Sequence, residues 1–345
     1  MFYLNMSIHL GVWLSVSIVF LAFHYSNANE PNGPTVHYET FDEYKSRLNK
    51  TYYQRWAESR SKKAFEENMR LIQTHNTLAK NGTYSFELRS NVMADYTNLQ
   101  YLRRFVRLTH SNRRKVEDVP NEMVGASLFQ VDTLPQSLDW REKGFLLPPN
   151  NQKSCGSCYA FSIAHSISGQ VYKRTGLLIP LSEQQLVDCS ALIGNHGCAG
   201  GSLRNTLRYL EQCGGLMREK DYPYTASQNI CKFNPELAVV NVTNWAILPS
   251  RDEDALKNAV ATVGPIAVSI NAAPKTFQLY SRGVYDDRDC SPDKVNHAML
   301  LLGYTPEYWI LKNWWGKNWG NDGYMKIKRG VNLCGIANFA AYAVV

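Results

Sequence analysis

The chain has 345 residues, of which 44% are apolar and 19% charged, and a net charge of +7 from 37 basic and 30 acidic residues. This composition supplies a packed core, favours about two domains, and excludes a wholly disordered, collagen-like or coiled-coil protein. The basic excess clusters only at Arg113–Lys115, so it gives little reason to expect nucleic-acid binding. We interpret this cluster as a solvated charge run, with a processing site as the alternative.

The N-terminus has the pattern of a secretory signal. Leu10–Phe23 is an apolar run of 14 residues, which is too short for a membrane span of about 20 residues. Ser26-Asn27-Ala28 follows as a small-x-small cleavage site, although the usual positively charged segment before the run is missing. We therefore expect residues 1–28 to be a cleaved signal peptide, with a short membrane anchor or a buried N-terminal helix as the alternatives.

The region from Val36 to about Thr109 is rich in charged and amide residues and contains an amphipathic pattern. Apolar residues recur there near helical spacing, which predicts a helix with one buried face: Phe65, Met69, Ile72 and Leu78. Residues 110–133 then lose this periodicity and mix charge with Pro and Gly. That stretch is typical of an exposed linker, where proteolysis concentrates.

Beyond Leu134 the sequence predicts helices first and strands later. The first helix follows Cys158 and stops near Gly176, the second has Ser182 as N-cap with Gln185 at the capping-box position, and the third is capped by Ser250 and ends at Gly264. Four strands are then expected, over Ile266–Ile270, Ala298–Gly303, Tyr308–Asn313 and Tyr324–Lys328. This order favours an α+β architecture in two lobes.

All eight cysteines lie between Cys155 and Cys334, behind a region that has none. A disulfide-linked module that follows a cysteine-free segment fits a secreted precursor.

Cys158 is the strongest candidate for a catalytic residue. It lies directly before the first predicted helix, in Gln152-Lys153-Ser154-Cys155-Gly156-Ser157-Cys158-Tyr159-Ala160-Phe161-Ser162. The N–H groups and positive partial charge at a helix N-terminus stabilise a thiolate, so we expect its pKa to lie below about 8.5. A redox pair or half of a zinc site is the alternative, but neither a thioredoxin-like context nor a second ligand pair is evident.

A nucleophilic cysteine needs a base that a third group holds in place. His165 lies two helical turns beyond Cys158 and cannot face it, and we expect His196 to be exposed in a loop. His297 begins an apolar strand 139 residues after Cys158, and Asn313 ends the next strand. Two adjacent strand ends can present an imidazole and an amide side by side. A core histidine with satisfied hydrogen bonds is the alternative for His297.

These motifs resemble the papain family of cysteine proteases, in the precursor form of the cathepsin L-like group. The resemblance covers essentially the whole chain and includes further segments in the family's order: Leu134–Arg141, Ser182–Ser190, Gly197–Gly201, Asp221–Tyr224 and Trp315–Tyr324. It implies an α+β fold with a helical lobe and a β-barrel-like lobe, preceded by a helical inhibitory propeptide. The implied boundaries are 1–28 for the signal, 29–132 for the propeptide and 133–345 for the peptidase domain.

The resemblance also assigns roles to individual residues. Cys158 matches the nucleophile, His297 the acid/base, Asn313 the amide that orients its ring, and Gln152 the side-chain donor of the oxyanion hole. Trp315 matches the indole that shields the Asn–His hydrogen bond. The resemblance also assigns substrate-binding positions: Gly200, Gly201, Ser202, Leu203, Ser269, Val295, Ala298, Trp315 and Phe339. Six of them line the pocket for the second residue before the scissile bond, called S2: Ser202, Leu203, Ser269, Val295, Ala298 and Phe339.

The family's disulfide pattern pairs Cys155 with Cys198, Cys189 with Cys231, and Cys290 with Cys334. With Cys158 as nucleophile, this leaves Cys213 as a free thiol. Sequence alone does not determine this connectivity.

The chain departs from the family pattern at several positions. Lys153, Tyr159 and Trp314 replace a usual Gly, Trp and Ser, and we expect Lys153 and Trp314 to crowd the site and narrow substrate choice or slow turnover. In the propeptide, Ala57 and Ser61 occupy the Glu and Arg positions of the helical inhibitor motif, so its internal salt bridges are in doubt.

The resemblance implies an endopeptidase made as a zymogen, with no cofactor and no metal, acting on protein and peptide substrates in a lysosome or outside the cell. Its own propeptide is the expected inhibitor, cystatin-like proteins are possible further inhibitors, and a monomer without a membrane span is expected. The alternatives are a catalytically silent peptide-binding relative, and an N-terminal region with an inhibitor role of its own after release.

Overall fold

The computed structural model of the chain describes residues 38–109, 123–124 and 133–345. The expected signal segment, including Leu10–Phe23 and Ser26–Ala28, lies outside the described residues, as do the cluster Arg113–Lys115 and most of the expected linker. The described helices and strands fall within one unit, Glu39–Val345.

The N-terminal region is mainly helical, with α1 (Phe41–Leu48), α2 (Arg55–Lys80), β1 (Phe86–Leu88) and α3 (Asn98–Phe105). Thr40 and Thr97 begin α1 and α3 with capping boxes, in which the threonine side chain and a residue three positions later bond each other's backbone N–H groups. The amphipathic prediction for α2 is confirmed, because Phe65, Met69 and Ile72 are buried on one face.

A polar network around the buried Asp95 holds this region together. Its carboxylate accepts hydrogen bonds from the hydroxyls of Tyr44 (2.8 Å) and Tyr52 (2.6 Å), and it forms an ion pair with Lys50. Lys50 also donates a hydrogen bond to the carbonyl of Val92 at 2.7 Å. These partners come from α1 and the segment after it, so the inhibitor-like fold keeps an internal ion pair without a Glu or Arg at positions 57 and 61.

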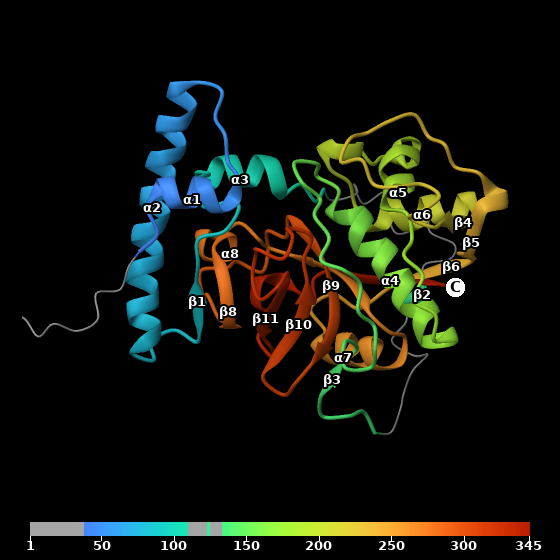
Figure 1. The fold of residues 1–345 in the computed structure, drawn as a ribbon. Helices are drawn as coiled ribbons and strands as arrows, with labels where there is room; N and C mark the ends of the chain where they lie inside the picture. The colour runs from blue at the N-terminus through green and yellow to red at the C-terminus, as the bar shows by residue number, and fades with distance from the viewer. Residues whose placement is uncertain (1–37, 110–122, 125–132) are drawn as a thin grey trace, which may run out of the picture. The chain divides into compact units, whose positions relative to one another are not determined.

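The C-terminal region holds the remaining elements, most of which Figure 1 labels. The helices of four or more residues are α4 (Cys158–Thr175), α5 (Glu183–Cys189), α6 (Leu203–Cys213), α7 (Glu253–Thr262) and α8 (Lys275–Gln278). The strands are β3 (Leu138–Asp139), β4 (Gly215–Met217), β5 (Ala238–Asn241), β6 (Asn244–Ile247), β7 (Ile266–Ile270), β8 (Tyr280–Tyr285), β9 (His297–Tyr304), β10 (Tyr308–Lys312), β11 (Tyr324–Lys328) and β12 (Ala340–Val344), and β2 is Met123–Val124.

Local sequence signals account for most of the helix ends. Gly176 ends α4 in the left-handed conformation, and the Ser182 hydroxyl caps α5, as predicted. The Gln185 side chain does not complete a capping box, because it bonds Tyr209 and Gly215 instead. The prediction for α7 is wrong by two residues: Asp252 is the N-cap.

The main sheet has ten strands, nine of them in the order β1-β8-β11-β10-β9-β7-β12-β6-β2, while β3 also pairs with β9. Its path has two ends among the described strands, so it does not close into a barrel. The strand β1 of the N-terminal region extends the sheet by antiparallel pairing with β8, with Phe86 opposite Gly283. Helix α4 packs against β9, β7, α5 and α6. Figure 1 shows β9 on one side of α4 and α5 and α6 on the other. The two-lobed α+β prediction is confirmed in this form.

Candidate active site

Three disulfides fix the loops of the helical lobe and one end of the sheet. They join Cys155 to Cys198, Cys189 to Cys231, and Cys290 to Cys334, which is the pairing that the resemblance implies. The two free cysteines are Cys158, which is buried, and Cys213, which is half-buried.

Cys158 is the first residue of α4, so its thiol lies at the end of the helix where N–H groups are unpaired. Backbone hydrogen bonds involving Ala298, Tyr159 and Arg107 lower its pKa. Burial is the larger effect and raises the pKa to about 12. The expected low thiol pKa is therefore wrong for this form of the protein, because the N-terminal region covers the thiol and desolvation disfavours the thiolate.

His297 and Asn313 lie side by side, as the strand pattern predicts. His297 begins β9, Asn313 directly follows the neighbouring strand β10, and the His297 Nε2–H donates a hydrogen bond of 2.8 Å to Asn313 Oδ1. Both side chains are buried. Burial lowers the pKa of His297 to about 4, although the bond to Asn313 opposes this effect. In this form the imidazole is neutral above about pH 5.

The indole of Trp315 covers this pair, and other aromatic rings pack around the indole. Its ring stacks on the His297 ring with a centroid distance of 4.8 Å and an interplanar angle of 29°. Its other faces meet Trp319 and Phe277 edge-on. Because only 1% of Trp315 is exposed, the indole excludes water from one side of the imidazole.

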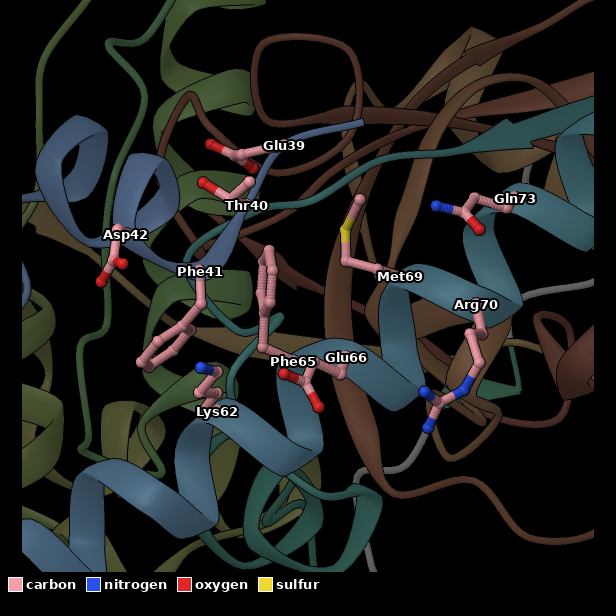
Figure 2. A pocket seen from close by; sticks show the side chains of 10 residues that line it. All are labelled: Glu39, Thr40, Phe41, Asp42, Lys62, Phe65, Glu66, Met69, Arg70 and Gln73. Carbon is pink, nitrogen blue, oxygen red and sulfur yellow. The ribbon is translucent and has the colours of Figure 1, made fainter. Parts of the chain in front are cut away.

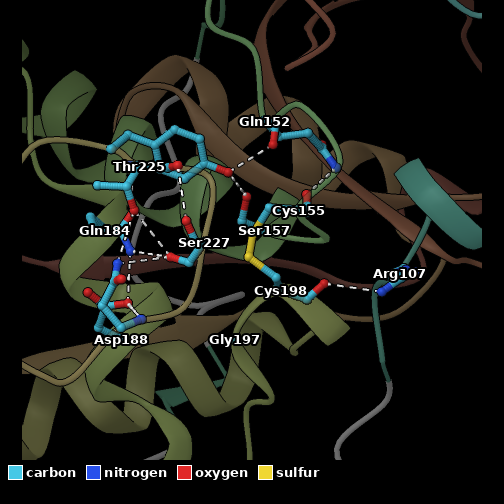
Figure 3. Close-up of a disulfide and its surroundings, with 12 residues drawn as sticks. Arg107, Gln152, Cys155, Ser157, Gln184, Asp188, Gly197, Cys198, Thr225 and Ser227 are labelled. Atoms are coloured by element: carbon cyan, nitrogen blue, oxygen red, sulfur yellow. Dashed lines mark hydrogen bonds between the residues drawn. A yellow bond between two sulfur atoms is a disulfide. The ribbon is translucent and has the colours of Figure 1, made fainter. Parts of the chain in front are cut away.

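Gln152 lies next to the Cys155–Cys198 disulfide (Figure 3). Its amide Nε2 donates hydrogen bonds to the carbonyl oxygens of Cys155 at 2.9 Å and Phe105 at 3.1 Å. Phe105 is the last residue of α3, so a carbonyl of the N-terminal region already occupies this donor. A carbonyl held by Gln152 is the type of group that an oxyanion hole binds.

The segment 105–109 of the N-terminal region leads from the last residue of α3 across the site. The Leu108 N–H donates to the Asn296 carbonyl and the Thr109 N–H to the Gly201 carbonyl, each at 2.9 Å. Leu108 and Gly201 form a parallel bridge, and Figure 3 shows Arg107 bonded to the Cys198 carbonyl. We call residues 105–109 the cleft segment. No local pattern in the sequence predicts this segment, because it pairs with residues far along the chain.

The glycines beside the cleft segment leave room for its backbone. Gly200 has a φ of +125°, and a Cβ there would lie 2.2 Å from the Arg107 carbonyl oxygen. At Gly201 a Cβ would lie 2.7 Å from both Asn195 Oδ1 and Tyr159 Cε1. A larger residue at position 200 would therefore clash with the backbone of the cleft segment, and one at position 201 would clash with its own neighbours in the peptidase domain.

The residues expected to line S2 come from four elements. Ser269 on β7 lies opposite Ala298 on β9, and its N–H donates to the Phe339 carbonyl at 2.8 Å. The Ser269 hydroxyl is buried and has no hydrogen-bond partner among the described atoms. The Phe339 ring is half-buried, with the Arg204 guanidinium 5.6 Å from its centroid. Three others are buried at the start of α6 and before β9: Ser202, Leu203 and Val295.

The three departures from the family pattern have different outcomes. Lys153 is exposed and has a φ of +55°, a conformation that favours glycine. The Tyr159 hydroxyl is buried and donates to the Gly197 carbonyl at 3.1 Å. Trp314 does not crowd the cleft: its side chain is fully buried and stacks on Phe161 of α4.

The other two histidines of this region stand apart from Cys158. His196 is exposed, as predicted. His165 faces Glu183 across α4 and α5, with 2.8 Å between Nε2 and Oε1. This buried pair was missed, because nothing in the spacing of residues 165 and 183 predicts that two helices bring them together.

A separate hollow of about 390 Å³ lies between α1 and α2 (Figure 2). Charged side chains of both signs line it together with Phe41, Phe65 and Met69, and none of the candidate site residues does. Across the described ranges there is no group of three or more His, Cys, Asp or Glu side chains arranged to hold a metal ion. No helix in those ranges is long and apolar enough to cross a membrane.

Comparison with known proteins identifies both regions. Residues 134–344 match the papain family cysteine proteases, and residues 41–101 match the cathepsin propeptide inhibitor domain (I29). Cathepsin L2 of Homo sapiens is 41% identical over 287 residues, covering 81% of this chain and 84% of that protein. Cathepsin L of Sarcophaga peregrina is 38% identical over 315 residues, covering 89% and 93%.

Solved structures agree with this relationship. The digestive procathepsin L2 proteinase from the Tenebrio molitor larval midgut aligns with a TM-score of 0.80 and 32% identity, over 88% of this chain and 98% of that one. The digestive procathepsin L 3 from the same tissue aligns with a TM-score of 0.76 over 88% and 97%. The chain therefore belongs to the papain family of cysteine proteases and is a cathepsin L-like protease made as a proenzyme.

Proposed function

We propose that Cys158 is the nucleophile of this protease, that His297 is its acid/base, and that Asn313 orients His297. The thiolate of Cys158 attacks the peptide carbonyl, His297 gives its proton to the leaving amine, and water then hydrolyses the thioacyl-enzyme. The observation that carries the proposal is the hydrogen bond of 2.8 Å between His297 and Asn313, shielded by Trp315. It fixes the ring so that Nδ1 remains free for the thiol, and Nδ1 has no other described partner.

Gln152 and the backbone N–H of Cys158 form the oxyanion hole in this proposal. The Gln152 amide already donates to a carbonyl of the cleft segment at 3.1 Å, which supports its ability to bind a substrate oxyanion there. Residues 200 and 201 then pair with the extended substrate, as Gly201 pairs with Leu108 in the proenzyme.

Activation follows from the same contacts. The cleft segment covers Cys158 and occupies Gln152, so the propeptide of residues 29–132 must leave before a substrate can bind. Acid protonates carboxylates in an interface of this kind and loosens it. The contacts that must break include the ion pair between Glu87 and Arg282, at 2.9 Å. We expect cleavage within residues 110–133 and a mature N-terminus between Val131 and Gln136, which N-terminal sequencing of acid-treated precursor tests.

The predicted S2 pocket favours Val or Leu. Leu203, Val295 and Ala298 supply apolar walls, and a charged substrate side chain there would lose its water without gaining a partner. Phe339 fills part of the floor, so an aromatic side chain would be overpacked, at a cost of about 1–3 kcal/mol. The nearby Arg204 guanidinium further disfavours a basic side chain.

We propose that this endopeptidase acts in lysosomes or outside the cell, after removal of residues 1–28 as a signal. The three disulfides support an oxidising compartment. Protein and peptide substrates are its partners, its propeptide is an intramolecular inhibitor, and cystatin-like inhibitors and a monomeric state are further expectations.

Comparing two cysteine variants tests the catalytic assignment. Each precursor is cleaved in the linker by an added aspartic protease, which is then inhibited, so that processing does not depend on the variant's own activity. Cys158→Ala should abolish hydrolysis of a fluorogenic peptide, while Cys213→Ala, the matched control, retains it. Asn313→Ala should retain a reduced rate. Hydrolysis by Cys158→Ala at the control rate would contradict the assignment.

A further inference from the structure

Trp314 connects three segments of the proposed catalytic centre, which carry Asn313, Gln152 and His297. Its backbone N–H donates to Asn313 Oδ1 and its carbonyl accepts the Gln152 N–H, each at 2.8 Å, and any residue other than proline at this position would keep these two bonds. The side chain adds a third link. Its indole Nε1–H donates to the carbonyl of Ala298 at 2.9 Å, next to His297 on β9.

The indole rests on a buried pair of polar residues. The His165 ring meets the Trp314 ring edge-on, with centroids 4.7 Å apart, and His165 Nε2 lies 2.8 Å from Glu183 Oε1. Trp314 is 0% exposed, and the side chains of His165 and Glu183 are 4% and 1% exposed. The position of the indole therefore depends on a hydrogen bond between α4 and α5.

We propose that Trp314, seated on the His165–Glu183 pair, is a positioning residue that holds His297 and Asn313 in register. The indole fixes the Ala298 carbonyl, and with it the start of β9, relative to the end of β10. This inference rests on the proposed catalytic roles of His297 and Asn313, and it adds a support to them from the interior of the protein.

Burial, more than the charged groups around it, keeps the pair neutral at acidic pH. Burial raises the pKa of Glu183 to about 8 and lowers that of His165 well below its usual value. Lys312 on β10 lowers the pKa of both residues, and Glu219 after β4 raises that of His165, but these effects are smaller than that of burial. Lys312 donates hydrogen bonds to the carbonyls of Leu147 and Pro148. Below about pH 7 the pair is a neutral hydrogen bond, so the support is constant under acidic conditions.

The test compares two buried tryptophans, each of which loses the hydrogen bond that its indole N–H donates. Trp314→Phe removes the indole N–H from Ala298, while Trp309→Phe removes a bond of 2.9 Å to Glu253 from a buried indole on β10, away from His297. In Trp314→Phe we expect kcat to fall about tenfold with KM within about twofold. The acid limb of its pH profile should also shift, because the bond between His297 and Asn313 is less well held. Trp309→Phe should keep the wild-type kcat and pH profile.

A second pair of variants covers the case in which Trp314→Phe does not fold. Glu183→Gln keeps a hydrogen bond to His165 and should retain kcat within about twofold, whereas Glu183→Ala should lose about as much as Trp314→Phe. Equal kcat in Trp314→Phe and Trp309→Phe, or in the two Glu183 variants, would overturn the inference. If Cys158→Ala also remained active, the proposed function itself would be wrong. If kcat did not differ within the Trp314 and Glu183 comparisons while Cys158→Ala was inactive, the catalytic assignment would stand and only the role of Trp314 would be wrong.

Discussion

Cleavage and removal of the propeptide should convert Cys158 from an inert thiol into a reactive thiolate. In the proenzyme, burial raises the pKa of Cys158 to about 12 and lowers that of His297 to about 4. A pH of 7 is about five units below this pKa, so roughly one molecule in 10⁵ carries a thiolate at that pH. A free cysteine with a pKa of about 8.5 is roughly 3% ionised at the same pH. The proenzyme thiol should therefore react about 10³-fold more slowly than a free cysteine.

Alkylation with iodoacetamide measures this difference. The Cys213→Ser variant leaves Cys158 as the only free thiol among the described residues, and adding Cys158→Ser gives the background. Adduct formation is followed by mass spectrometry in the proenzyme, in the activated enzyme and with glutathione as the reference thiol. We expect the activated enzyme to react faster than glutathione, because removal of the cleft segment exposes the helix terminus and allows an ion pair with His297.

The pH dependence separates ionisation from access. If ionisation limits the reaction, the proenzyme rate should rise about tenfold per pH unit between pH 6 and 9 without a plateau. A rate that does not change with pH would mean that the cleft segment blocks the reagent sterically. A proenzyme that reacts as fast as glutathione at pH 7 would refute the reasoning, because the thiol would then not be desolvated.

Three further substitutions test separate parts of the account. Gln152→Ala removes one oxyanion donor and should lower kcat by about 10²–10³-fold, with KM little changed, in steady-state kinetics; an unchanged kcat would exclude this role. Phe339→Ala should raise cleavage of Phe-Arg relative to Val-Arg substrates, and an unchanged ratio would show that Phe339 is not the S2 floor. Lys50→Met leaves the buried Asp95 without its cation, a change that typically lowers the free energy of unfolding by about 3–5 kcal/mol. The propeptide should then be released more easily, so the precursor should activate at higher pH than the wild type, as followed by gel electrophoresis. An unchanged activation pH would count against a role of this network in holding the propeptide in place.

Local patterns predicted the elements that carry the site. The apolar run at residues 266–270 and the alternating pattern at residues 324–328 match β7 and β11, and the helix that follows Cys158 ends at Gly176 as its glycine indicates. These signals are local, because strand alternation and helix caps depend on residues within a few positions of each other. The pairing of His297 with Asn313 was predictable in the same way, since both lie at ends of neighbouring strands.

Long-range contacts explain what the sequence did not predict. The cleft segment pairs through Leu108 with Gly201 and Asn296, which lie more than 90 residues away, and no local sequence pattern predicts this pairing. Trp314 was expected to add bulk beside Asn313, and its ring turns into the interior, where it packs against His165 and Phe161. The predicted direction of the Cys158 pKa shift is wrong for the proenzyme. The effect of a helix terminus can be predicted from the local sequence, whereas burial depends on the whole fold.

Labelling of the activated enzyme with a thiol-reactive peptide epoxide tests the catalytic assignment of Cys158 most directly. Peptide mapping by mass spectrometry should locate one adduct per molecule on Cys158, with loss of hydrolytic activity in proportion to labelling and no adduct on Cys213. The intact proenzyme should remain unlabelled, because the cleft segment occupies the site. An enzyme that stays active when Cys158 is fully modified, or that loses activity through an adduct elsewhere, would contradict the account.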